Sequence, residues 1–274
     1  VNYVEKHFPD CRDHLSSSKS PMSMFGAVAK TYYPEKAGVD VKDIVTVAVM
    51  PCTAKKFEAA RPEMGRNGMA DVDIVLTTRE LIKLIKYVGL SLQNLPESEF
   101  DSPLGTGTGA GAIFGATGGV MEAALRTVYE VITNETLPKI DFHEVRGFDG
   151  IRESTITVNG RDIHIAVAHT LKNARAIMEQ VKAGTSPYDF IEIMACPGGC
   201  IGGGGQPIGT TNAIRKKRMA SLYQIDRSLP LRKSHENPEI QTLYKEFLGE
   251  PLSEKSHELL HTHYHKVDKP YEFR

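Results

Sequence analysis

The four cysteines are the residues of this 274-residue chain best suited to bind a metal. Cys196 and Cys200 share one glycine-rich loop. Cys52 directly follows a proline, and Cys11 lies alone in a polar stretch. Four cysteines are too sparse for a disulfide scaffold in a chain of this length. Thiolates prefer soft metals, so zinc and iron–sulfur clusters are the main candidates. The absence of a C-x-x-C pair argues against structural zinc, although a lone Cys52 would also suit the role of a buried structural thiol.

Two predicted strands end at these cysteines. Residues 44–50 and 190–194 are short apolar runs that stop just before Cys52 and Cys196. A run without alternation, such as 44–50, is typical of a parallel strand that is buried on both faces. Cofactors gather at the carboxyl ends of strands in open α/β sheets, so we expect both cysteine sites to face one cofactor.

The remaining patterns predict an α/β fold. We expect a strand at 72–76, a helix at 79–88 capped by Thr77 and Thr78, a glycine-rich loop at 105–119 leading into a helix at 120–132, a β-hairpin around Asn159-Gly160 and a helix at 171–183. Residues 213–274 contain helical segments and no clear strand. We therefore predict parallel sheets flanked by helices in two lobes, with the cluster site between them. The expected domain covers residues 1–212, and a helical C-terminal segment, 213–274, packs on it.

Composition excludes some partners. The net charge of −1 gives no reason to expect nucleic acid or an anionic membrane surface. No apolar stretch approaches the roughly 20 residues of a membrane span. Nothing before Cys11 is typical of a signal peptide, and the first residue is Val1 rather than methionine. We expect a cytoplasmic protein whose chain begins here at a processing point or a truncation.

Long motifs around the cysteines resemble those of one family. Residues 50–58, MPCTAKKFE, resemble the second cysteine motif of the iron-only ([FeFe]) hydrogenases, M-P-C-x-x-K-x-x-E. Residues 192–207, EIMACPGGCIGGGGQP, resemble the third motif, and residues 111–126, 19–21 and 233–237 also match the family pattern. The chain is therefore identified by resemblance as a C-terminal portion of the catalytic domain of such an enzyme.

The resemblance implies a role for each motif residue. Cys52, Cys196 and Cys200 would bind a [4Fe-4S] cluster, and Cys200 would bridge to a di-iron unit that carries CO, cyanide and a dithiolate. Together these two parts form the H-cluster. Lys55 would donate a hydrogen bond to a cyanide, and Ser16 would relay protons. The pocket around the di-iron unit would be lined by Met50, Met194, Pro21 and Phe114.

The activity implied by the resemblance is reversible oxidation of H2 to protons and electrons. Ferredoxin or another carrier, or an NAD-linked system, would take the electrons. The first cysteine motif is expected upstream of Val1, with the fourth cluster ligand, the proton-transferring cysteine and the accessory iron–sulfur domains; Cys11 matches neither cysteine. Met22 stands where many relatives have a glutamine near a cyanide. We therefore expect the isolated chain to be inactive.

Other interpretations of the sequence stay open. The serious alternative is a hydrogenase-like protein of cytosolic iron–sulfur assembly without a di-iron unit, and sensory members of the hydrogenase family are also possible. Residues 257–261 spell H-E-x-x-H, the zinc metallopeptidase motif, but they lie close to the chain end with no following domain to form a cleft. The basic run 215–218 is more typical of a solvated helix face than of a nucleic-acid site.

Overall fold

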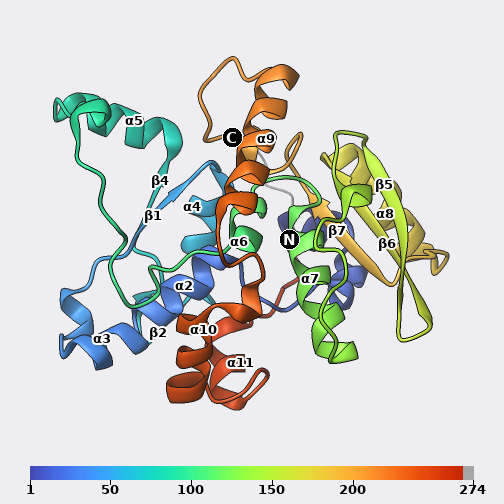
Figure 1. Cartoon of the computed structure of the whole chain (residues 1–274), viewed down its shortest axis with the longest axis horizontal. Coiled ribbons are helices and arrows are strands. Elements are labelled where there is room, and N and C mark those ends of the chain that lie inside the picture. The colour runs from blue at the N-terminus through green and yellow to red at the C-terminus, as the bar shows by residue number, and fades with distance from the viewer. Residues whose placement is uncertain (268–274) are drawn as a thin grey trace. The chain divides into compact units, whose positions relative to one another are not determined.

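The structure, a computed structural model, describes residues 1–267 and divides into two compact units (Figure 1). Unit 1 combines Val1–Gly105, Gly204–Pro207 and residues 239–267. Unit 2 combines Thr106–Gly203 and Ile208–Pro238. The predicted C-terminal segment is thus divided between the two units, and its last residues, 268–274, lie outside the described residues. The boundary predicted at residue 212 stays a prediction.

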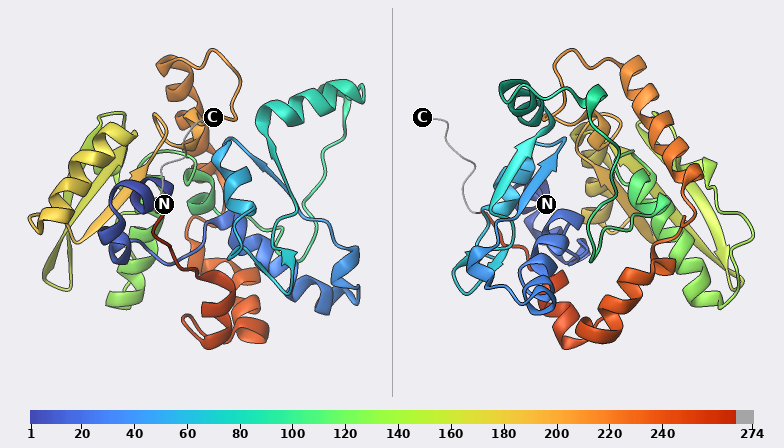
Figure 2. Two further views of the ribbon diagram at one scale, coloured as in Figure 1. Left: turned by 180° about the vertical axis from the view of Figure 1, so that it is seen from behind. Right: turned by 60° about the vertical axis from the view of Figure 1, so that its left-hand side comes forward.

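Unit 2 is a three-layered α/β/α sandwich. Its sheet has the order β5-β6-β7, with β5 (Ile151–Val158) antiparallel and β7 (Phe190–Met194) parallel to β6 (Arg161–His169). Helix α7 (Gly119–Thr133) packs its Met121 and Leu125 on one face of β6, through Ile165 and Val167. Helix α8 (Leu171–Ala183) lies on the opposite face of the sheet (Figure 2). Its Ile177 packs against Ala166 and Ala168. The α/β class predicted from the sequence is therefore confirmed.

The predicted hairpin is present in unit 2. Val158 pairs with Arg161, which leaves Asn159 and Gly160 as a two-residue loop with φ of 50° and 74°. Two consecutive positive φ values are those of a type I′ turn, which favours Asn-Gly because its twist matches that of the strands. The turn fixes the register of β6, and β6 in turn aligns β7, the strand that precedes Cys196.

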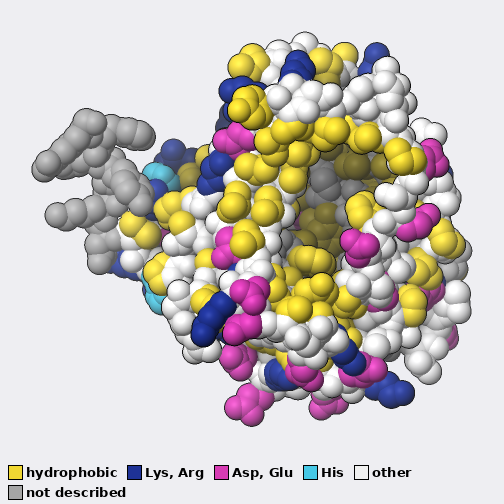
Figure 3. All heavy atoms as spheres, turned by 90° about the vertical axis from the view of Figure 1, so that its left-hand side faces the viewer, with side chains coloured by type: hydrophobic (Ala, Val, Ile, Leu, Met, Phe, Trp, Pro, Cys, Tyr) yellow, Lys and Arg dark blue, Asp and Glu magenta, His cyan; other side chains and the backbone are white. Residues whose placement is uncertain are grey.

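Unit 1 contains a smaller parallel sheet. Strand β1 (Val47–Met50) pairs with β4 (Ile74–Thr77), and the helices α2 (Pro21–Ala29) and α4 (Ala54–Ala59) supply Met22 and Ala59 to the cluster that covers one face. The prediction that strand 44–50 is buried on both faces was wrong. Val47 and Val49 are 52% and 42% exposed, and Ile74 on the paired strand is 45% exposed, so the second face of this sheet is open within the described residues. Figure 3 shows hydrophobic side chains on the side of the molecule that carries α5.

The predicted capped helix is α5 (Thr78–Tyr87). The Thr77 hydroxyl accepts from the Glu80 N–H, and Glu80 accepts from the Thr77 N–H, so the two residues form a capping box. The apolar side of α5 is exposed, as at Leu84, so this helix owes its start to the cap rather than to burial.

The other elements complete the two units. Unit 1 also holds α1 (Asn2–His7), α3 (Tyr32–Ala37), the short strands β2 (Gly65–Arg66) and β3 (Met69–Ala70), α10 (Pro238–Leu243, whose first residue is assigned to unit 2) and α11 (Glu254–Leu260). Unit 2 also holds α6 (Gly109–Ile113), a short helix within the predicted glycine-rich loop, and α9 (Asn212–Ser228). Within the described part of the chain, every helix is too short or too polar to cross a membrane.

Candidate metal centre

In unit 2 the cysteine loop directly follows a strand of the sheet. Strand β7 ends at Met194, Cys196 comes two residues later, and Cys200 opens a 3-10 turn, Cys200–Gly202. Both thiols are half-buried, and no cysteine of the chain is in a disulfide. The predicted position at the carboxyl end of a parallel strand is confirmed for Cys196.

The cysteine loop is held by backbone hydrogen bonds to the segment between α6 and α7. The Thr117 N–H donates to the Gly198 carbonyl at 3.0 Å, and the Ile201 N–H donates to the Gly115 carbonyl at 3.0 Å. Gly199 has a φ of 92°, and a Cβ atom there would lie 2.7 Å from the Thr117 nitrogen. Glycine is therefore required at Gly199 both by its conformation and by the close approach of the second backbone.

A buried carboxylate supports this attachment. The Glu192 side chain, on β7, accepts hydrogen bonds from the N–H groups of Gly118 at 2.6 Å and of Met121 at 2.7 Å. These groups belong to the first turn of α7. Its N-cap residue, Gly118, has no side chain that could cap the helix, so Glu192 takes this role. Burial raises the pKa of Glu192, and the backbone donors act in the opposite direction. Glu192 is the first residue of the third motif, but its spacing alone did not reveal its partner.

Further polar side chains hold the cysteine loop from outside. The Gly198 N–H donates to Nδ1 of His169 at 3.3 Å, and Nε2 of His169 lies 3.0 Å from the Phe148 carbonyl oxygen. From α9, Arg218 donates to the Ile201 carbonyl at 2.7 Å. A Cβ atom on Gly202 would lie 2.9 Å from Nε of Arg215, a buried nitrogen that has no hydrogen-bond partner among the described residues. The two arginines therefore place positive charge beside the loop that carries the thiols.

In unit 1, Cys52 lies two residues after strand β1. The segment Gly204–Pro207, which follows the cysteine loop in sequence, packs on its backbone: the Gly205 N–H donates to the Pro51 carbonyl at 3.1 Å. A Cβ atom on Gly205 would lie 2.7 Å from the Cys52 nitrogen, so this glycine too is required by a close approach. Cys52 is half-buried, like the other two candidate ligands.

Lys55, on α4, is held by a carboxylate in the same unit. Its ammonium lies 2.6 Å from Oε2 of Glu58. The other oxygen of Glu58 accepts from the hydroxyls of Ser20 and Ser23, the latter at 2.7 Å. Burial acts to raise the pKa of Glu58, but the charge of Lys55 and the three hydrogen bonds outweigh it, so the pKa lies below its usual value.

The other predicted residues are distributed over both units. In unit 1, Pro21 is the exposed first residue of α2, Met50 packs in the cluster with Met22, and Ser16 is exposed with its carbonyl accepting from the Tyr264 hydroxyl. In unit 2, Phe114 and Met194 are half-buried. Phe114 directly precedes the segment that is hydrogen-bonded to the cysteine loop, and Met194 ends β7. The structure thus brings Met50, Lys55 and Cys52 into one unit and Phe114, Met194, Cys196 and Cys200 into the other.

The residues present suit an iron–sulfur cluster. The candidate ligands are three half-buried thiols, two of them on a loop whose glycines let backbone pack directly on backbone. The buried Nε–H of Arg215 beside the loop is a donor of the kind that tunes cluster sulfurs. Arg215 and Arg218, both on α9, add positive charge beside the loop, which suits anionic thiolates.

Within residues 1–267 the H-E-x-x-H side chains are not arranged as ligands of one ion. Helix α11 ends at Leu260, so His261 is extended, and its Nδ1 lies 2.9 Å from the Ser17 hydroxyl. The rings of His257 and His261 are stacked in parallel, 4.6 Å apart.

Among residues 1–267, the one group of three possible ligands close enough for an ion is Glu130, His235 and Glu236. There the Lys233 ammonium already binds both glutamates, at 2.7 and 2.9 Å.

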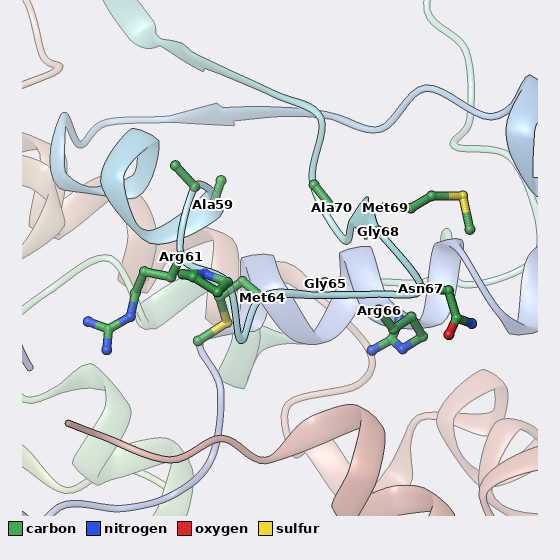
Figure 4. A pocket seen from close by; sticks show the side chains of 11 residues that line it. Ala59, Arg61, Met64, Gly65, Arg66, Asn67, Gly68, Met69 and Ala70 are labelled. Atoms are coloured by element: carbon green, nitrogen blue, oxygen red, sulfur yellow. The ribbon is translucent and has the colours of Figure 1, made fainter.

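A separate pocket of about 420 Å³ lies at the β2–β3 hairpin of unit 1 (Figure 4). It is lined by residues 59–62 and 64–70 and includes none of the predicted site residues. Its two arginines are paired: Arg61 with Glu5 at 2.6 Å and Arg66 with Asp71 at 2.7 Å. The pocket therefore offers no uncompensated charge for a ligand.

Family models match both parts of the sequence. The model described as "Iron only hydrogenase large subunit, C-terminal domain" matches residues 1–204, and "Iron hydrogenase small subunit" matches residues 212–267. The chain belongs to the iron-only hydrogenase family. Iron–sulfur cofactors are therefore characteristic of its relatives.

Individual relatives agree with this assignment. The chain is 55% identical over 267 residues to NADP-reducing hydrogenase subunit HndD of Solidesulfovibrio fructosivorans, covering 97% of this chain and 46% of that protein. A solved structure of a variant of the [FeFe]-hydrogenase HydA1 from Chlamydomonas reinhardtii matches with a TM-score of 0.82 at 45% identity, covering 96% of this chain and 73% of that one. Protein NAR1 of Arabidopsis thaliana is 34% identical over 98% of this chain and 60% of that protein. The chain thus spans about half the length of HndD.

Proposed function

We propose that this chain provides the larger part of the H-cluster site of an [FeFe]-hydrogenase that catalyses reversible oxidation of H2. The observation that carries the proposal is the arrangement of the thiols: each candidate cysteine site directly follows a parallel strand, and glycine-backbone contacts fix the chain around both. Cys52, Cys196 and Cys200 would bind the [4Fe-4S] cluster, with Cys200 bridging to the di-iron unit. When bound, the H-cluster supplies the redox chemistry that splits or forms H2.

The chain's own residues would bind and surround this group. Lys55 would donate a charge-assisted hydrogen bond to a cyanide ligand, a role suited to a compact ammonium. Met50, Met194, Pro21 and Phe114 would form an apolar wall that excludes water, and Ser16 would pass protons. Met22 would leave a cyanide without the amide contact that a glutamine offers.

The partners belong to the same proposal. H2 and protons would be the substrates, and ferredoxin or an NAD-linked carrier would exchange the electrons. A fourth cysteine ligand, a proton-transferring cysteine and accessory iron–sulfur domains would come from further sequence, as in a longer parent protein. A cytoplasmic location is also part of the proposal.

The alternative is an iron–sulfur assembly protein without a di-iron unit. The similarity to the cytosolic Fe-S cluster assembly factor narfl of Xenopus tropicalis, 30% identical over 98% of this chain, supports it. Infrared spectroscopy separates the two functions, because CO and cyanide ligands absorb where protein does not. The full-length natural form, matured with its cofactor, should show these bands and evolve H2. A [4Fe-4S] signal without CO and cyanide bands would favour the assembly function.

A ligand variant tests the bridging residue. Cys200→Ala should abolish the CO and cyanide bands, whereas Cys11→Ala, a buried cysteine outside the motifs, should retain them. Bands that persist in Cys200→Ala would exclude Cys200 as the bridge to the di-iron unit.

A further inference from the structure

Glu58 binds Lys55 on its own helix, α4, and two serines at the start of α2, the helix that begins with Pro21. It lies on α4, one turn after Lys55, and its Oε2 atom is 2.6 Å from the Lys55 ammonium. Its Oε1 atom accepts from the hydroxyls of Ser20 and Ser23 at the start of α2, where Pro21 is the first residue. One carboxylate therefore links the lysine on α4 to the helix that begins with the proline.

The surroundings favour a charged and ordered carboxylate. The side chains of Lys55 and Glu58 are 21% and 24% exposed, so solvent screens the pair less than a surface pair. Three donors satisfy Glu58, and Glu58 is the one acceptor that the Lys55 ammonium meets within the described residues. An ammonium has three N–H groups, so Lys55 can donate to Glu58 and still offer a donor to a second anion.

The start of α2 depends on the same group. The Ser20 hydroxyl accepts from the Ser23 N–H at 3.4 Å as the N-cap of α2, and it donates to Glu58. A hydroxyl has one proton to donate and can accept as well, so both bonds are compatible. Removal of the Glu58 charge would loosen Lys55 and the α2 N-terminus together.

We infer that Glu58 is a positioning residue for the di-iron pocket, which holds the Lys55 ammonium where it meets a cyanide ligand and keeps the Pro21 end of α2 beside it. This inference rests on the proposed function. Glu58 does not touch the cofactor in this scheme; it acts through Lys55. A long lysine side chain has several rotatable bonds, so without an anchor its ammonium would spread over many positions and meet the ligand less often.

The test is a double-mutant cycle read by infrared spectra of the cyanide bands in the matured full-length protein. The variants are Glu58→Gln, Lys55→Gln and the two combined. Glu58→Gln should shift a cyanide band in the same direction as Lys55→Gln, and it should add nothing further in the Lys55→Gln background. Glu58→Asp, which keeps the charge, should move the band part of the way back.

A neighbouring pair provides the matched control. Lys56 and Glu80 also form an ion pair, at 3.0 Å, in which Lys56 lies on α4. Glu80→Gln removes that charge and can still complete the capping box of α5. Its cyanide bands should coincide with those of the unmodified protein.

The outcomes that overturn the inference are distinct. An unshifted band in Glu58→Gln, or a shift that is equally large in the Lys55→Gln background, would show that Glu58 does not act through Lys55. If the Glu58→Gln variant does not bind the cofactor, the Ser23→Ala variant tests the inference instead, because it removes one hydrogen-bond donor to Glu58. A smaller shift of the cyanide band in the same direction supports the inference, and an unshifted band overturns it. An unmodified protein without CO and cyanide bands would refute the proposed function itself, and the inference with it.

Discussion

The Glu192 carboxylate accepts the Gly118 N–H at 2.6 Å, which joins the strand before the cysteine loop to the start of α7. Glu192→Gln should lower the free energy of unfolding by about 1–3 kcal/mol, because an amide has one acceptor oxygen and would leave a buried N–H without a partner. Urea unfolding of the cluster-free protein measures this. Glu179→Gln, in an exposed pair with Arg175, should change it by less than about 0.5 kcal/mol. Equal effects in the two variants would contradict the supporting role of Glu192.

Gly199→Ala should disrupt the cysteine loop. The new Cβ atom would clash with Thr117 and strain the φ of 92°, with a cost of about 1–3 kcal/mol. Iron and acid-labile sulfide per chain should fall well below those of the unmodified protein. Gly209→Ala is the control, since Gly209 also has a positive φ but open space around it. A full iron content in Gly199→Ala would show that the loop does not need this close approach.

Arg126 is the centre of a buried ion network in unit 2. It is fully buried and binds Glu122 at 2.8 Å and Asp226 at 2.7 Å. Arg126→Leu would take one charged partner from each of two buried carboxylates, which keep Arg146 and Arg232, so we expect a loss of about 3–5 kcal/mol in the free energy of unfolding. Arg161→Leu, at an exposed pair, should cost less than about 1 kcal/mol. Similar midpoints in denaturant for both variants would refute this role of Arg126.

Asp141 should make unit 2 sensitive to acid. Burial acts to raise its pKa, but Arg232 and Arg146 outweigh burial and lower the pKa from 3.8 to about 2. A lowered folded-state pKa stabilises the protein above pH 3.8, and this contribution of about 2 kcal/mol is lost as the pH falls from about 4 through 2. Asp141→Asn should therefore flatten the pH dependence of unfolding in this window. An unchanged slope would show that the ion pairs do not form in solution.

The histidine-rich tail should be indifferent to zinc. His257→Ala and Glu258→Gln should leave the zinc content of the purified protein unchanged, because the His257 and His261 rings are stacked rather than turned toward one ion. Metal analysis by mass spectrometry measures this. Loss of a stoichiometric zinc ion in either variant would revive the metallopeptidase hypothesis.

The sequence predicted most elements near the cysteines. Strand Phe190–Met194 and helix Leu171–Ala183 have the predicted bounds. The helix ends where Gly184 adopts a left-handed conformation, a signal that the local sequence provides. The strand at Val47–Met50 was predicted in the right place, but its burial was not, because burial depends on which elements cover the sheet. His261 falls outside α11 because Ser17 and Ser18 bind it from a distant segment.

The candidate site was predicted by residue type rather than by contact. The motifs pointed to the cysteines and to Lys55, because thiols and ammonium groups can be identified from the amino-acid sequence alone. The partners of His169 and Glu192 came only with the structure, because their hydrogen bonds join segments that the sequence keeps apart. Glu58 could have been suspected from its spacing, because residues three apart on a helix are neighbours.

Unit 1 is built from three separate stretches of the sequence, and this affects the order in which it can fold during translation. Because Gly205 packs on the backbone of Cys52, the ribosome must reach the glycines after Cys200 before that surface can close. Until then the Cys52 backbone lacks the segment that packs on it, although strand β1 has already been made. Under the proposed function, all three candidate cysteine ligands are therefore synthesised before the surface around Cys52 can close.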